Sequence, residues 1–153
     1  MADDLATPEQ LAATEAMVTD WLDEQRAENP AVAAVDREPG ERRWFVRMRG
    51  EEKEVFTLWI TLGQRTLQFE TYVMPAPEEN HAAFYEHLLR RNRGFNGMAF
   101  CIGDEDALFL VGHLPVGAVD GGELDRILGE TYEYVERCFR PAMRIGYASR
   151  FKG

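Results

Sequence analysis

The sequence predicts an α+β fold, a twisted antiparallel sheet with helices mainly on one face. Two kinds of pattern carry this prediction. Stretches near residues 42–49, 55–62 and 66–73 alternate apolar and polar residues, which is typical of strands buried on one side. Stretches near residues 8–28 and 120–140 instead repeat apolar residues at helical spacing. The expected order is α-β-β-β-α-β-β-α with five strands, and 153 residues (1–153) fit a single domain.

The first helix is expected over residues 8–28. Thr7 suits the N-cap, Pro8 the first helical position, and Gln10 completes a capping box. An apolar stripe follows at helical spacing, formed by Leu11, Val18, Trp21 and Leu22. The helix should end before Asn29 and Pro30. Its acidic residues are expected to be solvated surface, with an acidic recognition face as the alternative.

The central element is a hairpin formed by residues 55–62 and 66–73, preceded by a strand over 42–49. The connection before it either is irregular throughout or contains a short strand near Val32 to Val35. Gly63 and Gln64 fit a type II′ turn, which would pair Leu58 with Phe69. Period-two alternation then buries one face, made of Phe56, Leu58, Ile60, Leu67 and Phe69. The opposite face is mostly polar apart from Val55, Trp59 and Tyr72.

A second helix is expected to open near Pro77, with an apolar stripe of Phe84, Tyr85, Leu88 and Leu89. Three arginines collect at its C-terminal end, where cations interact favourably with the helix dipole, namely Arg90, Arg91 and Arg93. We interpret this cluster mainly as a helix-terminal charge arrangement. Binding of an anion such as phosphate is the alternative.

A second hairpin is expected over residues 97–102 and 107–113, around a loop at 103–106. Both of its faces are apolar, so both need cover. One face is expected to hold Met98, Phe100, Ile102, Ala107, Phe109 and Val111, and the other Ala99, Cys101, Leu108 and Leu110. A second subunit would cover the latter four, which are therefore the dimer candidates. The last helix should be capped by Asp120 and Glu123 and should end at Pro141.

Charge and composition exclude several classes of function. The net charge is −10, and residues 1–41 carry 11 Asp/Glu against 2 Arg. Direct nucleic-acid binding is not expected, because it normally needs a clustered basic face. No run approaches ~18 apolar residues, so no membrane span is expected, and the acidic start at Asp3 and Asp4 differs from a secretory signal. We expect a cytoplasmic protein whose Cys101 and Cys138 are reduced thiols.

No catalytic, metal or cofactor site is apparent. Ser149 lacks the glycines of a nucleophile elbow, and Cys138 in a helix is interpreted as structural. His81 and His87 point to different helix faces and His113 is distant, so a zinc site is not expected. We therefore predict a protein that is not an enzyme and binds no cofactor.

Several segments instead resemble the actinobacterial branch of the YbjN family, over residues 42–153. The matching segments are Gly50-Glu51-Glu52, Thr61-Leu62, Thr66-Leu67, Glu70-Thr71-Tyr72, Pro75-Ala76-Pro77-Glu78-Glu79-Asn80, Leu88-Leu89-Arg90-Arg91-Asn92, Leu110-Val111-Gly112-His113-Leu114-Pro115, Glu123-Leu124-Asp125-Arg126-Ile127-Leu128-Gly129 and Ala142-Met143-Arg144-Ile145-Gly146-Tyr147. Members are described as bacterial sensory-transduction regulators, and their fold is similar to that of type III secretion chaperones. The resemblance implies a small dimeric protein that holds partner polypeptides, and it implies no catalytic residues.

The expected function is thus a chaperone-like or regulatory protein-binding module that acts as a homodimer. Val55, Trp59 and Tyr72 are the candidate contacts for a partner polypeptide of unknown identity. The rings of Trp59 and Tyr72 either border the dimer interface, give that partner an apolar contact, or only pack over neighbouring strands. A small-molecule sensor with a pocket between sheet and helices, and an unrecognised enzyme, are the alternative functions.

Overall fold

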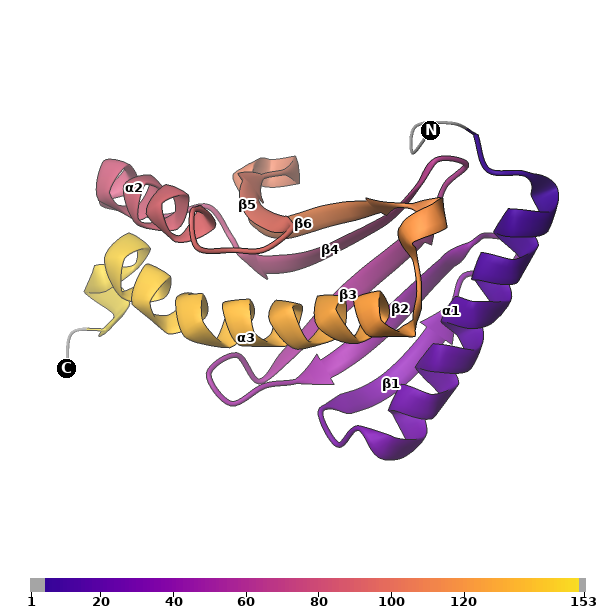
Figure 1. Ribbon diagram of the computed structural model, residues 1–153. Helices are drawn as coiled ribbons and strands as arrows, with labels where there is room; N and C mark the ends of the chain where they lie inside the picture. Colours follow the sequence, from indigo (N-terminus) through magenta and orange to yellow (C-terminus); the bar gives the residue numbers. More distant parts are fainter. Residues whose placement is uncertain (1–4, 152–153) are drawn as a thin grey trace.

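A computed structural model describes residues 5–151 as an open sheet covered by helices on one side (Figure 1). The helices are α1 (Pro8–Glu28), α2 (His81–Asn92) and α3 (Gly121–Gly146), with short 3₁₀ turns at Asp104–Asp106, Val116–Ala118 and Ala148–Phe151. Helices α1 and α3 lie across the same face of the sheet, and α2 contacts α3 and β5. This arrangement confirms the predicted α+β class with helices mainly on one face.

The sheet has six strands in the order β1-β2-β3-β4-β6-β5, and every neighbouring pair is antiparallel. The strands are β1 (Val32–Arg37), β2 (Arg43–Arg49), β3 (Val55–Leu62), β4 (Thr66–Met74), β5 (Met98–Ile102) and β6 (Leu108–Pro115). The expected count of five strands was wrong, because the stretch left open near Val32 to Val35 forms β1. Val32 and Val35 pair with Met48 and Val46 of β2 and lie on the helix-covered side.

The central hairpin has the predicted faces but not the predicted register. Leu58 pairs with Thr71, and Phe69 pairs with Ile60 rather than with Leu58. Three residues connect the strands, the N–H of Gly63 donates to the carbonyl of Thr66 at 2.9 Å, and Gly63 is not among the described glycines with positive φ. The type II′ turn is therefore wrong. The register differs by two residues, which leaves every side chain on its predicted face.

The second hairpin differs from its prediction by one residue, and this exchanges the faces of β6. Ile102 pairs with Leu108 across a five-residue connection, where a four-residue loop was expected. Glu105 and Asp106 adopt left-handed φ values of 59° in that loop, and the N–H of Gly103 donates to the carbonyl of Ala107 at 2.8 Å. A slip of one residue moves each side chain to the opposite face.

Helix α1 begins and ends as predicted. The backbone N–H of Gln10 donates to Thr7 Oγ1 at 3.1 Å, and the N–H of Thr7 donates to Gln10 Oε1 at 2.8 Å, which completes the capping box. The helix ends at Glu28, and Asn29 is its C-cap. Two indole N–H groups fix α1 in place, since Trp21 donates to Asp125 of α3 at 2.7 Å and Trp44 of β2 donates to Thr19 at 3.2 Å.

Helix α2 begins at His81 rather than at Pro77. The preceding N–H groups of Glu78 and Glu79 donate to the carbonyl of Gly146 at 2.9 and 3.0 Å, so they serve the end of α3 instead of starting a turn. Asn80, the N-cap residue, adopts a left-handed conformation with a φ of 53°, and its side chain donates to the carbonyl of Ile145 at 2.9 Å. Of the predicted stripe, Leu89 is exposed and does not reach the core.

Helix α3 continues past Pro141 to Gly146, where the sequence predicted an end. Its N-terminus is as expected, because the N–H of Glu123 donates to Asp120 Oδ1 at 2.8 Å. Ala142 and Gly146 are buried, and Gly146 lies against Phe84 of α2 and Pro77 of the segment before it, which offsets the hydrogen bond that Pro141 cannot make.

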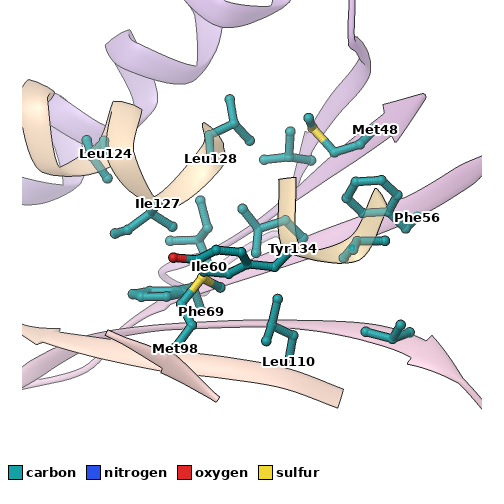
Figure 2. Packing of buried hydrophobic residues seen from close by; sticks show 14 of the residues in the cluster. Met48, Phe56, Ile60, Phe69, Met98, Leu110, Leu124, Ile127, Leu128 and Tyr134 are labelled. Carbon is teal, nitrogen blue, oxygen red and sulfur yellow. The ribbon is translucent and has the colours of Figure 1, made fainter. Parts of the chain in front are cut away.

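The core lies between α3, α1 and one face of the sheet. Figure 2 shows residues of α3 packed among strand residues, including Leu124, Ile127, Leu128, Met48, Phe56, Ile60 and Phe69. Fully burying one such side chain contributes about 1.5–3 kcal/mol. Leu108 and Leu110 belong to this core, with 2% and 0% of their surfaces exposed. Their burial corrects the predicted grouping of Ala99, Cys101, Leu108 and Leu110 on one face.

Candidate interaction surface

The face of the sheet opposite the helices is the candidate functional surface, and we call it the open face. Strand alternation places every second residue of each strand on it, including Arg43, Phe45, Arg47, Arg49, Val55, Trp59, Glu70, Tyr72, Ala99, Cys101, Phe109 and Val111. The side chains on the other face of these strands are largely buried. The open face is therefore where the sheet can meet a partner.

Three exposed apolar side chains of the open face are the predicted partner contacts. Val55, Trp59 and Tyr72 keep 41%, 43% and 43% of their surfaces exposed. The Trp59 ring meets Phe45 edge to face at a centroid distance of 5.8 Å, and the Tyr72 ring meets Phe109 in the same way at 5.8 Å. Each ring thus packs over a neighbouring strand and remains accessible.

Lys53 lies beside these rings, and the sequence interpretation missed it. Its amino group is 5.6 Å from the centroid of the Tyr72 ring and 4.9 Å from that of Phe139 in α3. Partial burial lowers the pKa of the Lys53 ammonium by desolvation. Such cation–π contacts join residues far apart in the chain, so no local pattern points to them.

A carboxylate of α3 holds the loop that carries Lys53. Glu136 accepts the N–H groups of Glu51 and Glu52 at 2.7 and 2.6 Å, and Arg140 pairs with Glu52. A Cβ at Gly50 would overlap the Glu136 carboxylate and the carbonyl of Lys53, so only glycine fits there. The loop at residues 50–54 is thereby fixed, and Lys53 is positioned before any ligand arrives.

Two hollows lie on the open face, and both are lined by Trp59 and its cross-strand partner Glu70. One, of about 500 Å³, is lined by Arg47, Lys53, Val55, Phe56, Thr57, Trp59, Glu70, Tyr72 and Phe109. The other, of about 810 Å³, is lined by residues that include Arg43, Trp59, Glu70, Met98, Val111 and His113. Both open to solvent, and both combine apolar walls with charged groups.

The dimer candidates separate into two groups. Ala99 and Cys101 lie on the open face together with Phe109 and Val111, whereas Leu108 and Leu110 face the helices and are buried. Cys101 is exposed, and partial desolvation together with the charge of Glu70 raises the pKa of its thiol. The number of residues in the loop at 103–107 decides which face each side chain of β6 lies on.

The three arginines lie at the C-terminal end of α2 as expected. Arg90 and Arg91 occupy the last turn, Arg93 is the C-cap residue, and Arg90 pairs with Glu86 at 3.6 Å. This position agrees with an interaction with the helix dipole. Binding of an anion by Arg90, Arg91 and Arg93 stays a prediction.

The histidines and cysteines of residues 5–151 form no metal or nucleophile cluster. Among residues 5–151 no group of three His, Cys, Asp or Glu side chains is arranged to hold a metal ion. Cys138 is buried, and this burial raises the pKa of its thiol and so disfavours the nucleophilic thiolate. Burial and the nearby Arg91 lower the pKa of His87.

A hollow between the sheet and the helices bears on the sensor alternative. It is lined by Gln25, Asn29, Ala31, Met48, Asp125, Leu128, Gly129 and Tyr132 and measures about 230 Å³. Sites for small molecules usually measure about 300–1,000 Å³ and enclose most of their ligand. The hollows of the open face are larger than this one.

Within residues 5–151, no helix has both the length and the apolar character needed to cross a bilayer.

The sequence of the chain matches the profile of YbjN, described as "Putative bacterial sensory transduction regulator", over residues 14–142. An uncharacterised protein of Mycobacterium tuberculosis is 34% identical over 105 residues, which cover 69% of this chain and 57% of that protein. An uncharacterised protein of Mycobacterium leprae is 31% identical over 107 residues, covering 70% of this chain and 58% of that protein. The match therefore spans less than two thirds of these curated relatives.

Two solved complexes contain a similar fold. A chain of the heterodimeric ExoU–SpcU complex of the Pseudomonas aeruginosa type III secretion system has a TM-score of 0.50 and 19% identity, covering 63% of this chain and 81% of that chain. A chain of the complex between the Yersinia pestis type III secretion chaperone SycH and a fragment of YscM2 has a TM-score of 0.52 and 11% identity, covering 80% and 96%. These likenesses confirm the expected type III secretion chaperone-like fold.

Proposed function

Because the chain belongs to the YbjN family, we propose that it is a cytoplasmic, non-enzymatic module, chaperone-like or regulatory, that binds a partner polypeptide and acts as a homodimer. The observation that carries this proposal is the open face. Val55, Trp59 and Tyr72 remain accessible there beside a hollow of about 500 Å³. Exposed aromatic side chains on a rigid sheet are suited to protein recognition, since they supply apolar area at a low cost in conformational entropy.

The fold likeness adds support of a limited kind. The similar chains come from complexes in which one polypeptide is bound to another, ExoU with SpcU and SycH with a fragment of YscM2. The low identities mean that only the fold is shared, so the partner of this protein follows from its own surface. Partner binding is proposed for the Trp59–Tyr72 region of that surface.

The homodimer is proposed for the neighbouring part of the open face. Ala99, Cys101, Phe109 and Val111 form a continuous apolar group there across β5 and β6. A stable dimer buries about 1,200–2,000 Å² in total, so the contact would extend beyond these four residues. Leu108 and Leu110 are no longer part of the proposed seam, because they are buried within the chain.

Partner capture tests the first part of the proposal. The wild-type chain and a Trp59→Ala/Tyr72→Ala variant are used as baits in the native cell, and the bound polypeptides are identified by mass spectrometry. Leu89→Ala is the matched control, because Leu89 is an exposed apolar residue of α2 away from the open face. Partners should be lost with the double variant and retained with the control. An unchanged set of partners would refute the role of the two rings.

Light scattering tests the second part. The homodimer should have twice the monomer mass of 17.5 kDa at micromolar concentration. Cys101 should react more slowly with maleimide in the dimer than in a dilute monomer, whereas Cys138 is buried within the chain in both. A mass of 17.5 kDa, or a dimer with unprotected Cys101, would contradict the proposed seam.

A further inference from the structure

We infer that the hollow beside Lys53 binds an acidic segment of the partner polypeptide, with apolar side chains against Trp59 and Tyr72 and a carboxylate against Lys53 and Arg47. This inference rests on the proposed partner-binding role of the open face. It adds the chemical class of the segment that this face selects. The juxtaposition of two cations with three exposed apolar side chains in one hollow carries the argument.

The cations of the hollow come from β2 and from the loop after it. Alternation along β2 places Arg43, Arg47 and Arg49 on the open face, and Arg47 lines the hollow with Lys53. Arg43 is engaged, since it donates to Thr61 at 3.2 Å and contacts Glu38. Within residues 5–151, Arg47, Arg49 and Lys53 form no ion pair. Their charges are therefore available to a ligand.

Lys53 is better placed for this role than a surface lysine. Its loop is anchored to α3 through Glu136, and its ammonium contacts the rings of Tyr72 and Phe139. Less rotational freedom is lost on binding when the side chain is already held. The desolvation that lowers the pKa of Lys53 is offset when a carboxylate reaches it.

Carboxylates of the protein determine where the acidic residue of the segment can lie. Glu70 pairs with Trp59 across the strands and lines both hollows, Asp36 pairs with Phe45 near the β1 edge, and Glu105 acts electrostatically on Tyr72. Glu70 repels an anion at the centre of the face, and Glu105 repels one beside Tyr72. The acidic residue is accordingly placed against Lys53 and Arg47 on the β2–β3 side of the hollow, and Glu70 and Glu105 limit the affinity.

The walls of the hollow favour a polypeptide over a nucleic acid. Aromatic rings beside cations also occur in sites for single-stranded nucleic acid, where positively charged grooves follow the phosphates. Here Glu70 lies in the middle of the face, so a strand with a charged phosphate at every nucleotide would be repelled there. A segment that alternates apolar and acidic residues meets both the rings and the two cations.

Fluorescence anisotropy with defined peptides tests the inference on the full chain. The probes are a labelled short peptide that alternates Leu or Phe with Asp or Glu, its analogue with Asn and Gln in place of the acids, and a labelled oligothymidylate. The acidic peptide should bind at least about fivefold more tightly than the neutral analogue. Lys53→Gln and Arg47→Gln should each weaken it about threefold to tenfold, and Glu70→Gln should strengthen it. Arg26→Gln removes one exposed cation from α1 and should change nothing.

Each other outcome overturns the inference in a different way. Equal binding of the neutral peptide, reduced by Trp59→Ala, would leave the proposed function intact and remove the acidic preference. Tight binding of the oligothymidylate lost with Lys53→Gln would assign the hollow to nucleic acid. Peptide binding that falls as the protein concentration rises would show that a second copy covers the hollow. No binding of the acidic peptide by wild type would refute the inference, while partner capture would still decide the proposed function.

Discussion

The two faces of the sheet use the same strands for opposite purposes. On the helix-covered face, Leu58, Ile60 and Phe69 have 0%, 1% and 1% of their surfaces exposed. One residue away along the chain, Trp59 and its strand neighbours on the open face remain accessible and meet charged groups. Because alternation separates the faces, stability should depend on one set of side chains and partner binding on the other.

The largest effect is expected from Leu58→Ala, which tests this separation most directly. Removing a fully buried Leu side chain leaves a cavity and should lower the free energy of unfolding by about 2–5 kcal/mol. Trp59→Ala, the adjacent position on the open face, should cost at most about 1.5 kcal/mol, because it loses mainly the edge contact with Phe45. Urea denaturation gives both values. Equal losses for the two variants would contradict the division between faces.

Gly50→Ala should affect both faces at once, because this glycine lies where α3 holds the Lys53 loop. The new Cβ would overlap the Glu136 carboxylate, and we expect a loss of about 1–3 kcal/mol. Gly117→Ala is the control, since a Cβ at Gly117 meets nothing within 4 Å. Thermal unfolding measures the stability, and binding of the acidic peptide should fall as well. Unchanged stability with Gly50→Ala would show that the loop is not held by Glu136.

An intermediate effect is expected at the β5 edge, where both faces end. The Asn92 side chain accepts the N–H of Phe100 at 2.7 Å and donates to its carbonyl at 3.3 Å, and so occupies the place of a neighbouring strand. Asn92→Ala should cost about 1–2 kcal/mol and expose an unpaired edge that promotes self-association. Equilibrium unfolding and light scattering measure the two effects. Asn92→Asp keeps the acceptor alone and should restore part of the stability.

The smallest effect is expected at the outer rim of the helix-covered face. Hydrogen bonds from Arg37 and then Arg42 lower the pKa of Glu15. A depressed carboxyl pKa adds stability above the unfolded-state value of about 4.5, and this stability is lost as the pH falls through the folded-state pKa. Glu15→Gln should cost about 0.2–1 kcal/mol at pH 7, and urea titrations should show this cost shrinking as the pH falls through the folded-state pKa. A cost that does not change on acidification would indicate packing rather than charge.

Much of the fold could be predicted because its signals are local. The capping box at Thr7 and Gln10, and the alternation through Leu58 and Phe69, depend on residues a few positions apart. The predicted register of the second hairpin was wrong because Glu105 and Asp106 adopt a left-handed conformation and lengthen the loop by one residue. Neither residue type requires positive φ, so the sequence does not indicate this conformation. Because the loop is one residue longer than predicted, Phe109 lies on the open face and Leu110 in the core.

The candidate surface could be predicted only in part. Trp59 and Tyr72 followed from alternation, and the structure leaves both exposed. Lys53 could not be found in this way, because its position depends on Glu136, Phe139 and Tyr72, which lie at least nineteen positions from it in the sequence. Contacts of this length leave no periodic pattern to detect.

The segment before α2 donates hydrogen bonds to the last carbonyls of α3, and this has a consequence for folding during synthesis on the ribosome. The carbonyls of Ile145 and Gly146 are bonded by Glu78, Glu79 and Asn80, which emerge long before them. The first four strands can pair as they appear, but the start of α2 lacks its partners until the last turn of α3 has left the exit tunnel. We expect a nascent chain to protect the β2–β4 meander from protease first and the start of α2 last.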